Sequence, residues 1–278
     1  METMWVDSHC HLESYDDLPQ VLANARAAKV NTLLAIGIGE GPDEMQCALE
    51  LAHANPQIFA TAGIHPQEAQ RATPEALAKL TDLAADPRCL AIGEIGLDYY
   101  HLENPEIPIQ QAAFVAQMKI AAAARKPITI HCRTYELAIP AAKEKFGPAD
   151  AWEDLLTLIA EHWMPSGLPG IMHCFSGNKQ QAQRSLAAGF YLSFAGNVTY
   201  PKSTTIQEVA RDAPADRILV ETDAPFLAPG TLRGQRCEPA YTALTGEFVA
   251  ELRGVAAELL AAQTTENFFR LFPSARAV

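Results

Sequence analysis

The chain has 278 residues, of which 49% are hydrophobic and 19% charged, so it can bury a large core and is not disordered, collagen-like or coiled-coil. Its net charge of -12, with no cluster of Lys and Arg, argues against non-specific binding of duplex nucleic acid by a basic face. Six scattered cysteines, no signal-peptide pattern and no apolar run near the roughly 18 residues of a membrane span favour a soluble cytoplasmic protein with reduced thiols.

Short apolar, β-branched runs alternate with amphipathic stretches along the chain. In the stretches, apolar residues recur every three or four positions, as in Phe114, Met118 and Ala121, which is typical of helices. Eight strands are predicted, at residues 4–10, 31–38, 58–64, 89–95, 127–132, 170–175, 190–195 and 217–222. This alternation predicts the α/β class, as a single (β/α)8 TIM-type barrel domain over residues 1–278. A doubly wound sheet would usually carry a Gly-rich turn after the first strand, and this chain has none there.

The connection between the fifth and sixth predicted strands, from Arg133 to Pro169, is longer than one helix needs. We therefore expect an enlarged connection that contains two helices. The second helix is predicted to begin at Asp150, with Glu153 completing a capping box. Its apolar residues, at helical spacing, are expected to pack against the barrel: Trp152, Leu155, Leu156, Ile159 and Trp163.

Side chains suited to metal binding or acid–base chemistry stand where five predicted strands end. In parallel barrels, catalytic groups lie at these C-terminal strand ends. At the end of the first strand, the alternation of a β-strand places Asp7, His9 and His11 on one face. The other strands contribute, in chain order, Glu94, His131, His173 and Asp223.

A lone histidine at a strand end is usually a hydrogen-bonded structural group, but six such side chains at one barrel mouth require another explanation. Four imidazoles and two carboxylates are costly to desolvate together unless a cation neutralises them. This donor set suits Zn²⁺ or Mn²⁺, with Mg²⁺ also possible, rather than an all-oxygen Ca²⁺ cage. Two divalent ions bridged by one carboxylate would engage all six side chains.

Six short motifs follow one another over nearly the whole chain: DSHCH at 7–11, GIHP at 63–66, GEIGLDYY at 93–100, HCR at 131–133, HCFSG at 173–177 and ETDAPFL at 221–227. Together they resemble the TatD family of metal-dependent deoxyribonucleases. The resemblance implies an amidohydrolase-type barrel with a dinuclear metal site. It also implies hydrolysis of phosphodiester bonds in DNA, often from the 3′ end.

The resemblance also implies roles for individual residues. One ion would be held by His9, His11 and Asp223, the other by His131 and His173, with Glu94 bridging the two. Glu94 and Asp223 are the catalytic candidates, because the carboxylate of Asp223 can accept a proton from the attacking water. His65 and Arg133 are candidates for substrate binding at the rim, where either cation suits a phosphate oxygen; structural roles are the alternative.

Other residues near these motifs are expected to be structural. Asp98 and Tyr99 are predicted to hold the turn after Glu94 rather than to contact a nucleotide. Cysteines beside candidate ligands are predicted to be small core residues facing the helices: Cys10, Cys132 and Cys174. Solvated surface, on helices or loops far from the strand ends, is predicted for His53, His101 and His162. The family usually carries RGxxNxP after the last strand, and Cys237 replaces its Asn here, which puts the hydrogen bonds of that loop in doubt.

These features favour a 3′-5′ exonuclease that acts on single-stranded or frayed DNA ends, with nucleic-acid ends as its partner and no obligate protein partner. The alternative on the same barrel is a lactonase or amidase of small molecules, or an esterase of aminoacyl-tRNA. A bridging Lys would favour the amidase, whereas this chain offers Glu94. A non-catalytic metal-dependent scaffold would be expected to have lost a ligand, and none is missing.

Overall fold

The computed structural model describes residues 4–134 and 140–277 and confirms the predicted barrel. All eight strands pair in parallel and in chain order, and a bridge between Cys10 and Ala224 joins the first strand to the segment after the last. The strands are β1 (Trp5–Cys10), β2 (Val30–Ala35), β3 (Ile58–Ala62), β4 (Cys89–Asp98), β5 (Ile128–Arg133), β6 (Gly170–Met172), β7 (Phe190–Phe194) and β8 (Ile218–Val220).

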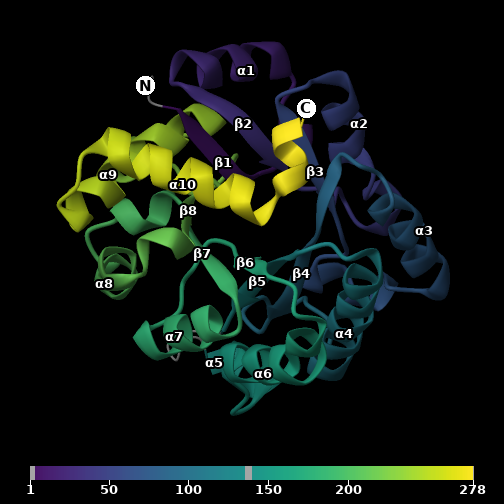
Figure 1. Cartoon of the computed structure of the whole chain (residues 1–278). Helices are drawn as coiled ribbons and strands as arrows, with labels where there is room; N and C mark the ends of the chain where they lie inside the picture. Colours follow the sequence, from purple (N-terminus) through teal and green to yellow (C-terminus); the bar gives the residue numbers. More distant parts are fainter. Residues whose placement is uncertain (1–3, 135–139, 278) are drawn as a thin grey trace.

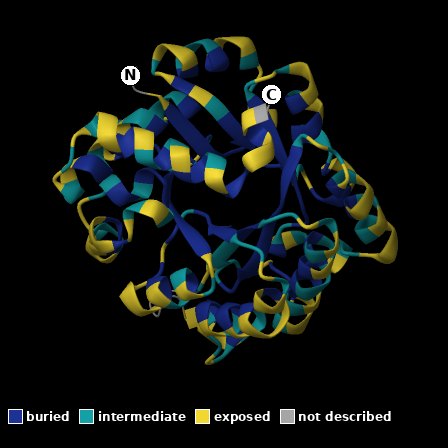
Figure 2. Cartoon of the chain, in the orientation of Figure 1, coloured by how far each residue is buried: buried dark blue, intermediate teal, exposed yellow. Residues whose placement is uncertain are grey.

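Helices surround the strands as an outer ring (Figure 1). They are α1 (Leu18–Ala27), α2 (Cys47–Ala54), α3 (Pro74–Ala84), α4 (Ile107–Ala124), α5 (Pro140–Phe146), α6 (Ala151–Leu158), α7 (Lys179–Ala187), α8 (Thr204–Asp212), α9 (Thr242–Arg253) and α10 (Ala257–Leu271). Figure 2 shows the strands buried at the centre and the exposed residues on the outer side of the helices. None of the helices in the described residues has an apolar stretch long enough to cross a membrane.

The enlarged connection between β5 and β6 contains α5 and α6, as predicted. The predicted apolar stripe of α6 and the turn after it is buried. Asp150 caps α6 as predicted, because its carboxylate accepts from the backbone N–H of Trp152 at 2.9 Å. No capping box forms. Glu153 instead pairs with Arg184 on α7 at 2.7 Å, so the predicted capping box is wrong.

The C-terminal helix α10 closes one end of the barrel. Residues near the starts of the strands, such as Phe59, Leu90 and Tyr191, form a buried cluster with Phe268 and Phe272. The side-chain amide of Asn267 on α10 donates to the carbonyl of Ile218, the first residue of β8, at 2.9 Å. Figure 1 shows α10 lying across β1 and β8. Because this helix covers the N-terminal strand ends, the functional groups can face solvent only at the opposite end.

Two buried glutamines on one face of α4 fix the ends of neighbouring strands. The side chain of Gln117 accepts from the N–H of Ile64 at 2.7 Å and donates to its C=O at 3.0 Å. Seven residues earlier, Gln110 makes the same pair of hydrogen bonds with Asp98, at 2.8 and 3.0 Å. The helix thereby holds the backbone next to His65 and at the end of β4.

We expect Gln117→Ala to destabilise the protein, because it leaves the buried N–H and C=O of Ile64 without partners. Each such group costs about 1–3 kcal/mol. The measurement is the free energy of unfolding in urea, with Lys119→Ala as the control on an exposed site of the same helix. The control should change it by less than about 0.5 kcal/mol. Equal stabilities of the two variants would show that Gln117 does not fix this strand end.

Candidate metal centre

Imidazoles surround the buried carboxylate of Glu94 at the C-terminal end of the barrel. Its two oxygens face different sides. Oε2 lies 3.3 Å from Nε2 of His9 and 3.8 Å from Nε2 of His11. Oε1 contacts three rings, at 2.7 Å from Nδ1 of His131, 2.8 Å from Nε2 of His173 and 3.6 Å from Nε2 of His65. One carboxylate thus connects two groups of imidazoles.

The backbone of β4 approaches β5 closely enough to make this arrangement possible. Gly96, with a φ of 147°, is the residue that permits the approach. A Cβ at this position would lie 1.9 Å from the carbonyl oxygen of His131. Only glycine fits there, so Glu94 and His131 can come into contact from adjacent strands.

Asp223 completes the group on the His9 side. Its Oδ1 lies 3.7 Å from Nε2 of His9 and 3.6 Å from Nε2 of His11. The residue follows β8 in a left-handed conformation with a φ of 57°, which Asp tolerates better than most residues. Its backbone N–H donates to the carbonyl of His9 at 3.0 Å. This turn directs the carboxylate to His9 of β1 and to His11, which follows β1.

Asp7 has a structural role, although the alternation of β1 predicted it on the same face as the two imidazoles. Its carboxylate accepts from the N–H and Oγ1 of Thr222, at 3.0 and 2.6 Å, and from the N–H of His9 at 3.2 Å. Burial raises the pKa of Asp7 to about 7, although the hydrogen bonds from Thr222 lower it. Asp7 therefore joins β1 to the end of β8 and holds the backbone of His9.

Two further carboxylates lie behind the imidazoles. Oδ2 of Asp98 is 3.2 Å from Nε2 of His131, and Oε1 of Glu221 is 3.1 Å from Nδ1 of His173. In each ring, the other nitrogen faces Glu94. This is how carboxylates orient histidines that bind metals. Asp98 also holds the turn after β4, as predicted, because its Oδ1 accepts from the N–H groups of Tyr100 and His101 at 2.8 and 3.3 Å. Glu221 was missed, although it opens the ETDAPFL motif.

The charges of the centre are mutually dependent. Burial alone would raise the pKa of Glu94, but His173, His9 and His131 together hold it well below its usual range. Burial opposes the protonation of His131, yet Asp98 and Glu94 raise its pKa to about 9. In the same way, Asp223 and Glu13 outweigh burial and raise the pKa of His11 to about 10. The cluster therefore takes up protons where no cation is bound.

The donor set fits divalent cations. Both ring nitrogens of His9 are buried without a hydrogen-bond partner, and its ring stacks on that of His173 at 3.7 Å. Burial lowers the pKa of His9, which favours the neutral ring and its free lone pair. A buried nitrogen without a partner is costly unless a ligand takes it. In the described residues, three groups of donors could hold a metal: His9–His173–Glu221, His9–His11–Asp223 and His65–Glu94–His131.

The two predicted substrate-binding residues lie in different surroundings. His65 stands among the candidate ligands, with its ring edge-on to that of His131 at 4.6 Å. Arg133 lies exposed at the rim, and its guanidinium stacks over Tyr100 at 3.6 Å. His101 lies beside it, 3.4 Å from Nη1 of Arg133 and 3.9 Å from Asp98. The prediction that His101 lies far from the strand ends is therefore wrong.

The other structural predictions near the site hold, with one exception. Cys10 is buried in the core, Cys132 packs against the core, and Tyr99 is buried and donates to Asp154 at 2.9 Å. His53 and His162 have side chains 56% and 36% exposed. Cys174 is the exception, because it is half-buried, has a φ of 41° and accepts from the side-chain amide of Asn197 at 3.5 Å. Burial and the charge of Asp223 raise the pKa of its thiol, so it stays protonated.

Cys237, in place of the usual Asn, does not disrupt its loop. Its backbone N–H donates to the carbonyl of Pro225 at 3.0 Å, and its own carbonyl accepts from the hydroxyl of Tyr15. The side chain is buried. Because the backbone makes both hydrogen bonds, the loop does not depend on an amide side chain at this position.

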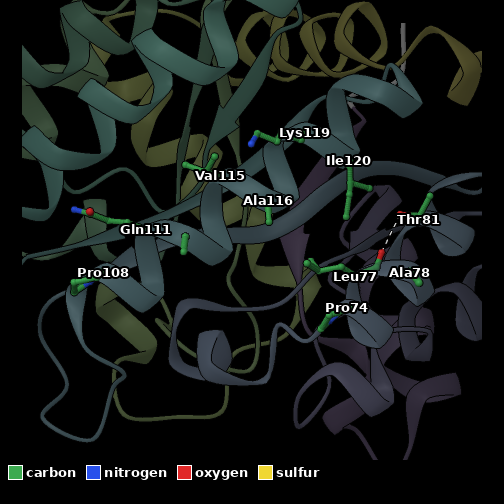
Figure 3. A pocket seen from close by; sticks show the side chains of 11 residues that line it. Pro74, Leu77, Ala78, Thr81, Pro108, Gln111, Val115, Ala116, Lys119 and Ile120 are labelled. Atoms are coloured by element: carbon green, nitrogen blue, oxygen red, sulfur yellow. Dashed lines mark hydrogen bonds between the residues drawn. The ribbon is translucent and has the colours of Figure 1, made fainter.

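A groove of about 790 Å³ lies elsewhere, on the outer surface between α3 and α4 (Figure 3). Pro74 and Leu77 line one side, and Val115 and Ile120 line the other. Among the described residues that line it, Lys119 alone carries a charge. This groove has none of the acid–base or metal-binding groups of the cluster around Glu94.

Known proteins resemble the chain over nearly its full length. The sequence pattern of the TatD related DNase family matches residues 6–273. The metal-dependent hydrolase YabD of Bacillus subtilis is 38% identical, covering 97% of this chain and 99% of its own. The 3′-5′ ssDNA/RNA exonuclease TatD of Escherichia fergusonii is 37% identical, covering 92% and 93%. The solved structure of the TatD homologue YJJV from Escherichia coli K12 has a TM-score of 0.86 at 25% identity, covering 98% and 99%.

We expect protons to be released when divalent ions bind to the chelator-treated protein at about pH 8. The pKa values of about 10 for His11 and about 9 for His131 lie above this pH, so both rings are protonated. A metal ion binds only the neutral imidazole, so the apparent affinity for Zn²⁺ should rise with pH. Calorimetric titration with Zn²⁺ in buffers of different ionisation enthalpy measures the release. His53→Ala, outside the centre, should release the same number of protons. Heats independent of the buffer would contradict this protonation state.

Proposed function

Because the chain belongs to the TatD related DNase family of metal-dependent hydrolases, we propose that it is a 3′-5′ exonuclease of single-stranded or frayed DNA ends. The observation that carries the proposal is the sharing of one buried carboxylate, Glu94, by imidazoles on two sides. Such a site suits two cations, and paired cations are typical of enzymes that hydrolyse phosphodiesters. The relative named as a 3′-5′ ssDNA/RNA exonuclease supports the substrate class. The activity would belong to a single barrel domain over residues 1–278.

In this proposal, the residues around Glu94 hold the metals. The first set comprises His9, His11 and Asp223, the second comprises His131 and His173, and Glu94 bridges them. Zn²⁺ or Mn²⁺ suits these donors, because imidazole nitrogen and carboxylate oxygen are both good ligands for them. When bound, such a pair activates water near neutral pH and neutralises charge on the attacking and leaving oxygens.

The other functional groups act on water and on the phosphate. The carboxylate of Asp223 is 15% exposed, so it can reach both the donor cluster and solvent. His11, His173 and His9 lower its pKa against the effect of burial. An ionised carboxylate here can accept a proton from the attacking water. His65 and Arg133 would bind phosphate oxygens, and the stacking of Arg133 on Tyr100 keeps its planar fork oriented.

Substrate form tests the proposal directly. Protein loaded with Zn²⁺ or Mn²⁺ should digest single-stranded DNA and 3′ overhangs and should leave closed circles intact, because a phosphate within an intact duplex cannot reach a metal pair inside the barrel mouth. Gel analysis of end-labelled substrates measures the products. Comparable cleavage of closed circles would refute recognition of ends. Turnover of a lactone, an amide or an aminoacyl-tRNA, with no cleavage of any nucleic acid, would replace the proposal by another hydrolase activity.

Two variants separate the role of the bridge from that of the base. Asp223→Asn should retain most of the metal and lose about 10²- to 10⁴-fold in kcat, because an amide can coordinate weakly but cannot accept the proton. Glu94→Gln should lose metal on both sides as well as activity, because a neutral amide cannot offset two cations. Metal content by atomic spectroscopy and kcat on single-stranded DNA are the measurements. Near-normal kcat in Asp223→Asn would exclude the residue as the base, and two tightly bound ions in Glu94→Gln would exclude the bridge.

A further inference from the structure

An exposed aromatic ring stands beside the candidate metal centre. The side chain of Phe226 is 59% exposed, more than any other large hydrophobic residue in the described parts of the chain. Its ring lies edge-on to the imidazole of His11, with 6.1 Å between the centroids. A single exposed phenylalanine on a surface needs no explanation. This one is three residues from Asp223 and packs against the ring of a candidate metal ligand, so it lies beside the proposed site of hydrolysis.

The backbone that carries Phe226 is anchored on both sides. The N–H of Phe226 donates to the carbonyl of Asp223 at 2.8 Å. The carbonyl of Pro225 accepts from the N–H of Cys237 at 3.0 Å, and the carbonyl of Ala228 accepts from the hydroxyl of Tyr200 at 3.0 Å. The ring is therefore presented to solvent from a fixed loop. An aromatic side chain in this position can bind a flat partner with little loss of conformational entropy.

The loop around Phe226 differs in charge from the rest of the acidic chain. Residues 224–237 contain Arg233 and Arg236 and no acidic residue. Both arginines are exposed, and their guanidinium groups stack on tyrosines, Arg233 on Tyr200 at 4.5 Å and Arg236 on Tyr15 at 4.4 Å. Positive charge and an exposed aromatic ring, here on one loop, are the combination by which proteins bind single-stranded nucleic acids.

We propose that Phe226 is a substrate-binding residue whose ring stacks on the base of the terminal nucleotide while its phosphodiester lies at the metal centre. The inference rests on the proposed function and adds to it the group that distinguishes a nucleotide end from other phosphodiesters. Every base has a flat face, so stacking binds all four nucleotides without reading sequence. Because the ring contacts the base and not the reacting atoms, it binds the ground state and the transition state alike. Its loss should therefore raise KM and leave kcat nearly unchanged.

The test compares Phe226→Ala with Phe226→Tyr on two single-stranded oligonucleotides, one with an ordinary 3′-terminal nucleotide and one with an abasic residue there. For the ordinary end, KM of Phe226→Ala should rise about 5- to 150-fold, which corresponds to the ~1–3 kcal/mol of one base–aromatic stack. Phe226→Tyr should remain close to wild type. The wild type should lose the same factor on the abasic end, and there Phe226→Ala should cause no further loss, because both changes remove one contact.

Inhibition by products gives a second readout. Deoxyadenosine 5′-monophosphate should inhibit the wild type more strongly than the base-free deoxyribose 5-phosphate, and the two should become equal in Phe226→Ala. Leu259→Ala is the matched control, because Leu259 is 49% exposed on α10 at the opposite end of the barrel. It should leave every value unchanged.

The outcomes separate the two proposals. If the wild type cleaves DNA and Phe226→Ala has the same KM on both oligonucleotides as the wild type, the stacking inference is wrong and the nuclease proposal stands. If the wild type cleaves no nucleic acid, both are wrong. If Phe226→Ala loses kcat with KM unchanged, the ring acts on the reacting groups rather than on the base, and the inference is again overturned.

Discussion

The arrangement of the C-terminal end of this barrel depends on one buried carboxylate. Glu94 lies within 4 Å of imidazoles from β1, β5 and the segments after β1, β3 and β6, and it has almost no contact with water. An isolated buried carboxylate would be protonated or would destabilise the fold. The imidazoles keep it ionised, and its charge in turn keeps several of them protonated. The pKa values of Glu94, His11, His131 and His173 therefore depend on one another, so the strands that carry these residues are coupled through Glu94.

Much of the site could be predicted from the sequence, because strand ends in a parallel barrel all face one mouth. That rule brought His9, Glu94, His131 and Asp223 together from segments far apart in the chain. It requires no knowledge of loop structure, only that each motif follows an apolar run. All eight predicted strands are present, since buried β-branched runs leave a strong signal in the sequence. Several are shorter than predicted, such as β6, which ends at Met172 rather than at Phe175.

Two errors arose where the backbone leaves the regular strand. Alternation predicted Cys174 among the helices, but β6 ends at Met172 and the left-handed backbone of Cys174 turns its side chain elsewhere. The pairing of β1 with β2 shifts between Asp7 and Cys10, and Asp7 binds Thr222 at the end of β8 instead of joining the imidazoles. Glu221 and His101 were missed for another reason: their roles depend on contacts with residues far away in sequence or beyond a turn, and no local pattern specifies those contacts.

The covering of the strand starts by α10 has a consequence for how a polymer can be handled. The barrel interior is packed with side chains, and Phe268 and Phe272 fill the end beneath them, so the described residues form a blind cup rather than a tunnel. In an exonuclease of this shape, the incoming strand and the departing mononucleotide use the same opening. The strand cannot be threaded through and held while it shortens, as it can in an enzyme with a separate exit. Each released nucleotide must clear the mouth before the next end enters, which favours distributive over processive degradation.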